Sequence, residues 1–222
     1  LGWDEKPGEA RETRLKRSNF IQTLVQISDS EAVAAARSRF TRLLQQPDSL
    51  APGDKEWVVH AVGMHADASQ YQQLLDLGRQ ASSNSERNLY YSALLRARDP
   101  LLAEQSLQLA LQTNLPGDIS SRVVPAVAHS EHTEQAWNFA IANREALLKH
   151  QGSLRLNRYF PSIMNSSLEV KHAEQLEQFA RQFLSEEAQI EAKRVSEGIR
   201  LHARRKQTLL PQLAQALQGQ SS

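Results

Sequence analysis

The sequence predicts an all-α fold with no β-sheet, and three observations lead to this prediction. Apolar residues recur at helical spacing in one segment after another, often directly after a capping residue. No stretch shows the strict polar–apolar alternation of a strand, and the Asn-Gly and Asp-Gly pairs of tight hairpins are absent. Helix pairs are expected to begin near residues 8, 54, 85, 118, 154 and 187, a spacing of about 31 to 46 residues that is typical of helical solenoids. We therefore predict a single helical-repeat domain over residues 1–222, a HEAT/armadillo-like α–α superhelix of stacked antiparallel helix pairs.

The first half of the chain is expected to contain six helices after a linker over residues 1–8. The first begins near Glu9, and the sixth ends at the Pro116-Gly117 step because proline and glycine stop helices. Four of these helix starts carry a side chain that can accept a hydrogen bond from an N–H group of the first turn. These are the capping-box spacings at Ser28–Glu31 and Ser83–Glu86, Asp54, and Asp99 before Pro100.

In the second half, a short helix starts at Asp118 and should kink at Pro125, and another over 154–164 should bend near Pro161. A third capping-box spacing, Ser166–Glu169, opens the next helix. Two helices then follow, one with its apolar stripe over 188–199 and one over 209–217, before a frayed tail at 218–222.

The clearest predicted helix runs over residues 132–152. Thr133 is expected to cap it and Gly152 to stop it. Its apolar stripe has helical spacing, so one face should be buried against neighbouring helices. The stripe consists of Trp137, Ala140, Ile141 and Leu148, widened by Phe139 and Leu147.

Composition excludes several classes of function. Lys and Arg total 26 against 25 Asp and Glu, so the net charge of +1 gives no broad basic surface for nucleic acid. No apolar run approaches the roughly 20 residues of a membrane span, so we expect a soluble chain without a membrane partner. The absence of cysteine excludes disulfides and thiolate chemistry and fits either a cytoplasmic or a periplasmic location. Because the chain begins with Leu1 rather than methionine, we expect a fragment or a processed product of a longer protein.

No catalytic motif is present. H-E-x-x-H, G-x-S-x-G, the P-loop and G-x-G-x-x-G are all missing. His129 and His132 lie three residues apart across a helix start, and His60 and His65 are five apart, so neither pair has the one-turn spacing that binds zinc. We therefore expect no catalytic residue, no metal site and no cofactor in this chain.

Three features are candidates for binding. Arg155, Arg158 and Tyr159 have the spacing of one helix face and are candidates for holding a carboxylate; a solvated face whose arginines pair with nearby glutamates is the preferred alternative. A second basic cluster is expected to stabilise a helix end, with a binding role as its alternative: Arg200, His202, Arg204, Arg205 and Lys206. Trp3 is expected to pack on the first helix or, preferably, to make an interdomain contact.

Four segments of the sequence are distinctive. They are LGWDEKPGE followed by Thr13-Arg14-Leu15, AWNFAIAN with Trp137, Phe139, Asn143 and Leu147, RYFPS, and Ser166–Glu169 leading to LEQFA. Together they resemble the C-terminal helical domain of zinc aminopeptidases of the aminopeptidase N and endoplasmic-reticulum aminopeptidase family, and the resemblance spans Leu1 to about Arg204.

The resemblance implies a parent enzyme that is a zinc metallo-aminopeptidase, with an upstream catalytic domain in the same chain and peptides as substrates. The present chain would then be a non-catalytic C-terminal domain that covers the active site, forms the substrate chamber and contacts the distal part of the peptide. A free-standing helical-repeat scaffold that binds another protein is the alternative. An enzyme for small molecules is disfavoured because no convergent acid, base or metal set is visible.

Overall fold

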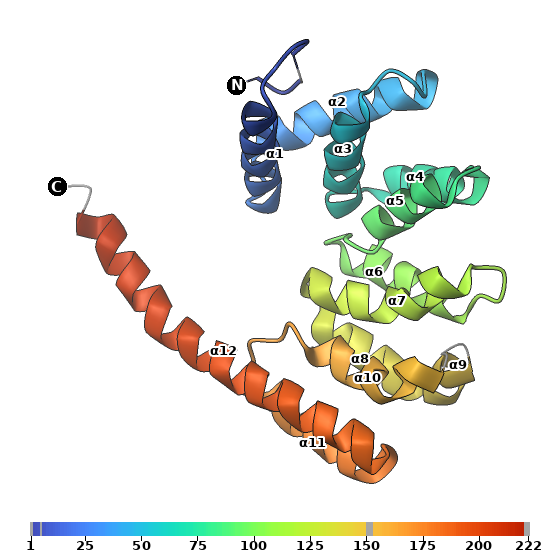
Figure 1. Ribbon diagram of the computed structural model, residues 1–222, viewed down its shortest axis with the longest axis vertical. Helices are drawn as coiled ribbons and strands as arrows, with labels where there is room; N and C mark the ends of the chain where they lie inside the picture. Colours follow the sequence, from blue (N-terminus) through green and yellow to red (C-terminus); the bar gives the residue numbers. More distant parts are fainter. Residues whose placement is uncertain (1, 5, 150–152, 220–222) are drawn as a thin grey trace. The chain divides into compact units, whose positions relative to one another are not determined.

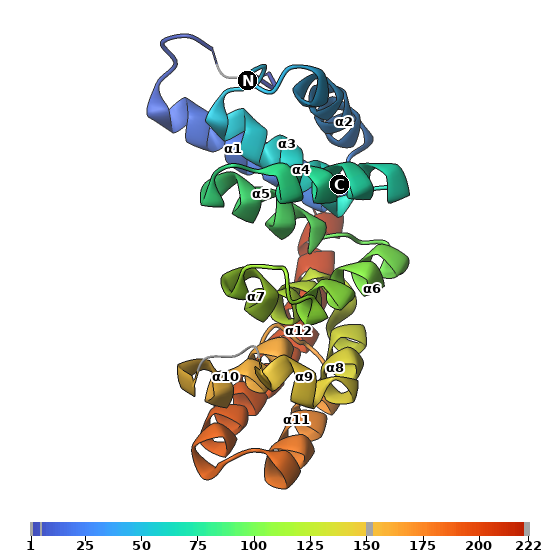
Figure 2. The same ribbon diagram turned by 90° about the vertical axis from the view of Figure 1, so that its right-hand side faces the viewer.

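The computed structural model describes residues 2–4, 6–149 and 153–219, with the side chains of 52, 117, 153–156 and 217–219 left out (Figures 1 and 2). Within these ranges every regular element is helical and no strand occurs, which confirms the predicted all-α class. Contacts divide the chain into two compact units, Leu1–Ser106 and Leu107–Ser222. The single domain expected over 1–222 stays a prediction.

Unit 1 is built from helices that pack in antiparallel pairs. α2 packs on α3, α4 on α5, and α3 on α5. Its fully buried core side chains include Phe40, Val58, Leu74 and Leu94. The helices are α1 (Arg11–Gln26), α2 (Ser30–Gln45), α3 (Pro52–Met64), α4 (Ala68–Gln80) and α5 (Asn84–Leu94), and α6 (Pro100–Gln108) begins in this unit and ends in the next.

Unit 2 is centred on α12, which packs along α10 and α11, while α7 and α8 contact α10. Trp137, Phe160 and Phe179 meet edge-on or tilted in its core, with ring centroids 4.8–6.4 Å apart. Its elements are η1 (Leu109–Leu111), α7 (Gly117–Val127), η2 (Ala128–His132), α8 (Thr133–Ala142), α9 (Arg144–Lys149), α10 (Ser153–Met164), α11 (Val170–Phe183) and α12 (Glu186–Gly219).

The predicted pair starts agree with the structure. α1, α3, α5, α7, α10 and α12 begin within three residues of the expected positions. The caps agree less well. Ser83 accepts a hydrogen bond from the Glu86 N–H at 3.2 Å, and Asp99 accepts from the Leu101 N–H at 2.8 Å, as predicted.

The caps of α2, α3 and α11 were predicted wrongly. Asp29, not Ser28, caps α2 by accepting from the Ala32 N–H at 2.9 Å. α3 begins at Pro52, so Asp54 lies in its first turn and accepts instead from Trp57 Nε1 at 3.2 Å. α11 begins at Val170, so Ser166 lies too early to cap it. Before α2, Ser28 and Asp29 are both residues that can cap, and the sequence alone does not fix which one does.

The predicted helix over 132–152 is two helices, α8 and α9, because Asn143 between them has φ −112° and ψ 22°. Thr133 does not cap α8; its hydroxyl donates to the Ala128 carbonyl at 2.9 Å. Ile141, assigned to the buried stripe, is 41% exposed, whereas Trp137, Phe139, Ala140 and Leu147 are buried as expected. Because the helix breaks at Asn143, the single predicted apolar face becomes two separate faces, one on α8 and one on α9. The predicted stop at Gly152 lies outside the described residues.

One further boundary differs from expectation: the two helices expected over 188–217 are the single helix α12. α10 runs through Pro161 without a break, the bend expected there stays a prediction, and so does the frayed tail at 218–222, since α12 is described to Gly219. The bend expected at Pro125 is not inside α7, which continues to Val127 before Glu131 takes φ 79° in η2. Residues 220–222 lie outside the described part of the chain.

Candidate functional site

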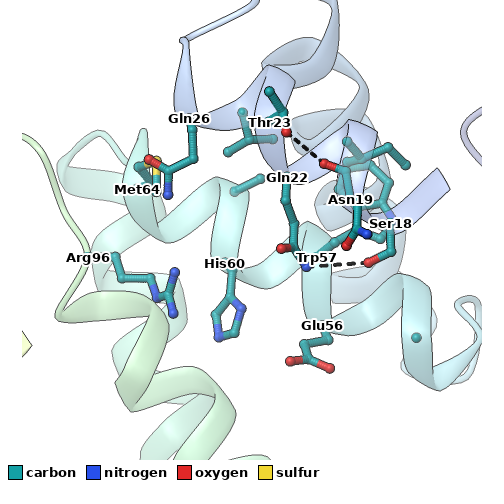
Figure 3. Close-up of a pocket in the computed structure, with 14 residues that line it drawn as sticks. Ser18, Asn19, Gln22, Thr23, Gln26, Glu56, Trp57, His60, Met64 and Arg96 are labelled. Atoms are coloured by element: carbon teal, nitrogen blue, oxygen red, sulfur yellow. Dashed lines mark hydrogen bonds between the residues drawn. The ribbon is translucent and has the colours of Figure 1, made fainter. Parts of the chain in front are cut away.

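A groove of about 530 Å³ lies between α1 and α3 in unit 1 (Figure 3). Polar side chains of α1 form one wall, Glu56, His60 and Met64 of α3 form the other, and Arg96 after α5 closes one end. Seven residues of α1 and six of α3 border it, and the α1 wall from Ser18 to Gln26 has a length of about 12 Å. The α1 wall consists of Ser18, Asn19, Gln22 and Gln26, and the apolar base consists of the buried Ile21, Val25, Trp57 and Ala61.

His60 is held neutral in this groove. Its Nε2 lies 3.1 Å from Ser92 Oγ, and the Ser92 hydroxyl donates to the Leu89 carbonyl at 2.9 Å, so Nε2 is assigned as the donor to Ser92. Burial, and then the charge of Arg96, lowers the pKa of His60 to about 4. The ring lies between Arg96 and Glu56 in Figure 3 and keeps Nδ1 as an acceptor at neutral pH.

Glu56 and Arg96 place opposite charges at different points along the groove. Both side chains are exposed, and neither forms an ion pair with any of the described residues. The carboxamides of Asn19, Gln22 and Gln26 can each donate and accept, as an extended peptide backbone requires. The arrangement suits a polar, chain-like ligand rather than covalent chemistry, because no nucleophile with a paired base lines it.

A second hollow of about 790 Å³ adjoins the groove and shares Ser18, Ile21 and Trp57 with it. The exposed cations Lys6 and Arg11 lie on its rim. Arg17, by contrast, is buried and pairs with Glu9, whose pKa this guanidinium lowers. The N-terminal end of α1 therefore presents positive charge beside the polar groove.

The predicted carboxylate site does not form as one surface. Arg158 is exposed on α10, but Tyr159 is 4% exposed, packs edge-on against Phe160 at 5.5 Å, and has a buried hydroxyl without a hydrogen-bond partner. Burial raises the pKa of that phenol. Adjacent helical positions point about 100° apart, which explains why Tyr159 belongs to the core while Arg158 is exposed. The side chain of Arg155 lies outside the described residues, and binding of a carboxylate by Arg155 and Arg158 stays a prediction.

Trp3 packs inside unit 1 rather than on α1. Its ring lies 6.4 Å from that of Trp57 in α3, and the guanidinium of Arg39 lies 5.7 Å from the Trp57 ring. Asp4 fixes this arrangement by a bidentate pair with Arg39, at 2.9 and 2.7 Å. The Trp3 ring is half-buried, and its expected interdomain contact stays a prediction.

Two of the histidines that the sequence singled out bond to backbone carbonyls. His65 Nε2 donates to the Val25 carbonyl at 3.0 Å, and His129 Nδ1 donates to the Pro125 carbonyl. Among the described residues no group of three or more histidines and carboxylates is arranged to hold a metal ion. The described residues therefore do not fit a zinc site.

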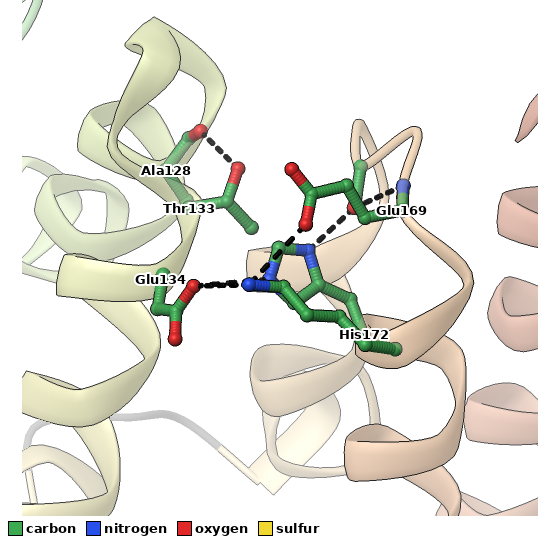
Figure 4. Close-up of polar contacts among 7 residues, drawn as sticks. Ala128, Thr133, Glu134, Glu169 and His172 are labelled. Carbon is green, nitrogen blue, oxygen red and sulfur yellow. Dashed lines mark hydrogen bonds and ion pairs between the residues drawn. The ribbon is translucent and has the colours of Figure 1, made fainter.

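A serine, a histidine and a glutamate lie close together in unit 2, although no sequence motif marks them (Figure 4). Ser167 Oγ lies 2.6 Å from His172 Nδ1, and His172 Nε2 lies 3.9 Å from Glu134 Oε2. Ser167 is 5% exposed and accepts the Glu169 N–H at 3.1 Å, so no substrate can reach it. Together with the ion pair between Lys171 and Glu134 at 2.6 Å, this cluster ties α11 to α8 rather than forming a catalytic triad.

The residues of the basic cluster near the end of the chain differ in their contacts. Arg200 pairs with Glu177 of α11 through two hydrogen bonds of 2.6 and 3.1 Å, and each partner shifts the pKa of the other in favour of its charged form. Arg204, Arg205 and Lys206 are exposed. A structural role is thus assigned to Arg200 alone.

The paired helices and the polar groove between α1 and α3 define a helical domain, and comparison with known proteins shows its family. The ERAP1-like C-terminal domain family matches residues 1–200, and the chain belongs to this family. Aminopeptidase M1 of Arabidopsis thaliana is 23% identical over 185 residues, covering 81% of this chain. The chain spans about a fifth of that relative, 21% of its length. None of the described helices is long and apolar enough to cross a membrane.

Proposed function

We propose that this chain is the non-catalytic C-terminal domain of a zinc-dependent aminopeptidase, with the catalytic domain in the same polypeptide. Membership of the ERAP1-like C-terminal domain family over residues 1–200 is the observation that carries the proposal. The similarity to Aminopeptidase M1 supports it, and the sequence contains no H-E-x-x-H of its own. Zinc would be bound by the catalytic domain.

In this role the domain covers the active site, encloses a substrate chamber and contacts the distal part of the peptide. The groove between α1 and α3 is the surface best suited to that contact, because its carboxamides can pair with a peptide backbone. An extended peptide advances about 3.3 Å per residue, so a groove of about 12 Å accommodates three or four residues. Arg96 would meet an acidic group of the peptide, and Glu56 a basic one.

The test compares a long and a short substrate in the whole enzyme. Replacing Arg96 by alanine is expected to raise KM several-fold for a peptide of about ten residues with an acidic distal end, because a charged contact is lost. Hydrolysis of an aminoacyl anilide, which is too short to reach the groove, should not change. Arg158→Ala is the parallel variant for the predicted site on α10.

Four outcomes would contradict the proposal in different ways. Absence of aminopeptidase activity in the whole protein would reject the family role for this chain. Unchanged kinetics of Arg96→Ala on the long peptide would remove the groove from substrate binding, and unchanged kinetics of Arg158→Ala would do so for the α10 site. Peptide cleavage by the 222-residue chain alone would show that it is catalytic.

A further inference from the structure

One face of α12 is buried in unit 2 and then continues into solvent. Four apolar side chains at intervals of three or four residues pack against α10 and α11. They are Ala192 (1% exposed), Val195 (4%), Ile199 (0%) and Ala203 (5%), and we call the line that they define the α12 seam.

The next positions at the same spacing are Lys206, Leu210 and Leu213. All three are exposed, Leu210 by 54% and Leu213 by 57%. Figure 1 shows that α12 continues past the end of α11 at which α11 begins. Leu168 and Val170, at the start of α11, are 44% and 42% exposed and line a hollow of about 480 Å³ with Lys206 and Leu210. The open seam therefore continues an internal helix–helix interface past the helix that covers it.

The charges beside the open seam indicate what would cover it. In the packed part, Arg200 next to the seam is neutralised by Glu177 of the covering helix α11. Lys206 lies in the open seam itself, and neither it nor Arg204 or Arg205 forms an ion pair within the described part of the chain. A covering helix would therefore place carboxylates opposite Lys206, because burying an unpaired ammonium is costly.

We propose that the open seam, formed by Lys206, Leu210 and Leu213 with Leu168 and Val170, binds an amphipathic helix of another protein, one whose apolar stripe is flanked by acidic residues. A second copy of this surface does not fit, because Glu169, the one carboxylate among the residues that line the hollow, is already paired with Lys171 at 3.3 Å. Leu168 and Val170 lie within the family match over residues 1–200, Lys206, Leu210 and Leu213 lie beyond it, and none of these residues takes part in the function proposed above.

The probe is a fluorescein-labelled synthetic helix of about 18 residues, with leucines at i, i+3, i+4 and i+7 and glutamates on both sides of the stripe. Fluorescence anisotropy with the 222-residue chain should show saturable binding. A matched peptide with every glutamate replaced by lysine should bind at least tenfold more weakly. The variant Lys206→Glu should lose this preference or reverse it, whereas Arg204→Glu, about 200° around the helix from Lys206, should keep it.

A second pair of variants tests the apolar part. Combining Leu210→Ser with Leu213→Ser should weaken binding of the acidic peptide at least tenfold, because two leucines would no longer be buried. Ile190→Ser is the matched control, since Ile190 is 73% exposed on the opposite face of α12 and its loss should leave binding unchanged. Circular dichroism of each variant should match the parent chain because all the replaced side chains are exposed.

Several results would overturn the proposal. One is the absence of saturable binding of the acidic peptide, and another is equal binding of the acidic and basic peptides. The third such result is an equal loss of peptide binding in the seam variant and the Ile190 variant. Light scattering that shows concentration-dependent dimers lost in the Leu210/Leu213 variant would assign the seam to a second copy instead. Binding of the chain, through the same leucines, to phosphatidylserine vesicles but not to the peptide would assign it to a membrane.

Discussion

Gly63 of α3 lies directly against the backbone of Ala93 in α5. A Cβ at Gly63 would come within 3.0 Å of the carbonyl oxygen, the carbonyl carbon and the Cα of Ala93. The absence of a side chain therefore lets these two helices approach each other, and their contact supports the wall of the groove that carries Glu56, His60 and Met64.

Gly63→Ala should lower the free energy of unfolding by at least about 2 kcal/mol, because the atoms that it meets belong to the backbone and cannot turn away. Gly198→Ala is the matched control, since Gly198 is in α12 with nothing within 4 Å of an added Cβ. Alanine there should stabilise the protein by about 0.5–1 kcal/mol through helix propensity. Urea unfolding measures both. A neutral Gly63→Ala would mean that α3 and α5 can separate without cost.

The all-α class and the pair starts were predictable because they depend on spacing along one segment. The break at Asn143 and the continuity of α12 were not, since each is decided by packing. AWNFAIAN reads as one amphipathic helix, yet Ile141 is exposed because the chain bends two residues later. In α12 the basic cluster over 200–206 was expected to stabilise a helix end, but it lies inside the helix, as suits Lys and Arg, which are good helix formers.

The pH dependence of stability should report on His60. Its pKa is about 4 in the folded state against about 6.5 when unfolded, so only the unfolded chain takes up this proton as the pH falls from 6.5 to 4. Stability from neutral His60 is therefore complete above pH 6.5 and lost across that window. For this half-buried ring, with Arg96 and Glu56 beside it, we expect a loss of about 1–2 kcal/mol after allowing for solvent screening.

His60→Gln should remove that acid sensitivity while keeping a donor for Ser92. Urea unfolding at pH 7.5, 5.5 and 4.5 should give curves for parent and variant that diverge as the pH falls. His202→Gln, at an exposed position on α12, is the control and should follow the parent at every pH. Identical pH profiles for the parent and His60→Gln would show that His60 protonates freely in the folded state.

The candidate site was less predictable than the fold. The sequence directed attention to Arg155, Arg158 and Tyr159 because they share a helix face, but burial removes Tyr159 from any surface site. The groove joins residues from α1, α3 and the end of α5, and no local pattern marks side chains so far apart in sequence. Glu56 and His60, one turn apart, were the one local signal available, and it is a common pair on solvated helices.

Arg39 should contribute more to stability than an ordinary surface arginine. Its side chain is 10% exposed, holds Asp4 with two hydrogen bonds and lies over the Trp57 ring. Arg39→Lys should cost about 1 kcal/mol, because lysine cannot make the bidentate pair, and Arg39→Ala about 2 kcal/mol, because packing is lost as well.

Arg79→Ala is the control for Arg39, because Arg79 is half-exposed and only 3.6 Å from Asp76; it should cost less than about 0.5 kcal/mol. Urea unfolding compares the variants, and hydrogen exchange of residues 2–4 and 6–8 should accelerate in Arg39→Ala but not in Arg79→Ala. Equal costs for the two alanine variants would mean that the segment carrying Trp3 and Asp4 does not stabilise unit 1.

Ser167 should matter to stability although it cannot catalyse. Ser167→Ala leaves His172 Nδ1 and the Glu169 N–H without their shared hydroxyl partner, which should cost about 1–2 kcal/mol because both groups are at least partly buried. Lys171→Met removes the exposed ion pair to Glu134 in the same cluster and should cost about 0.5 kcal/mol or less. Urea unfolding distinguishes the two variants. If Lys171→Met proved the more costly, the link between α8 and α11 would depend on the exposed ion pair and not on the buried hydrogen bonds.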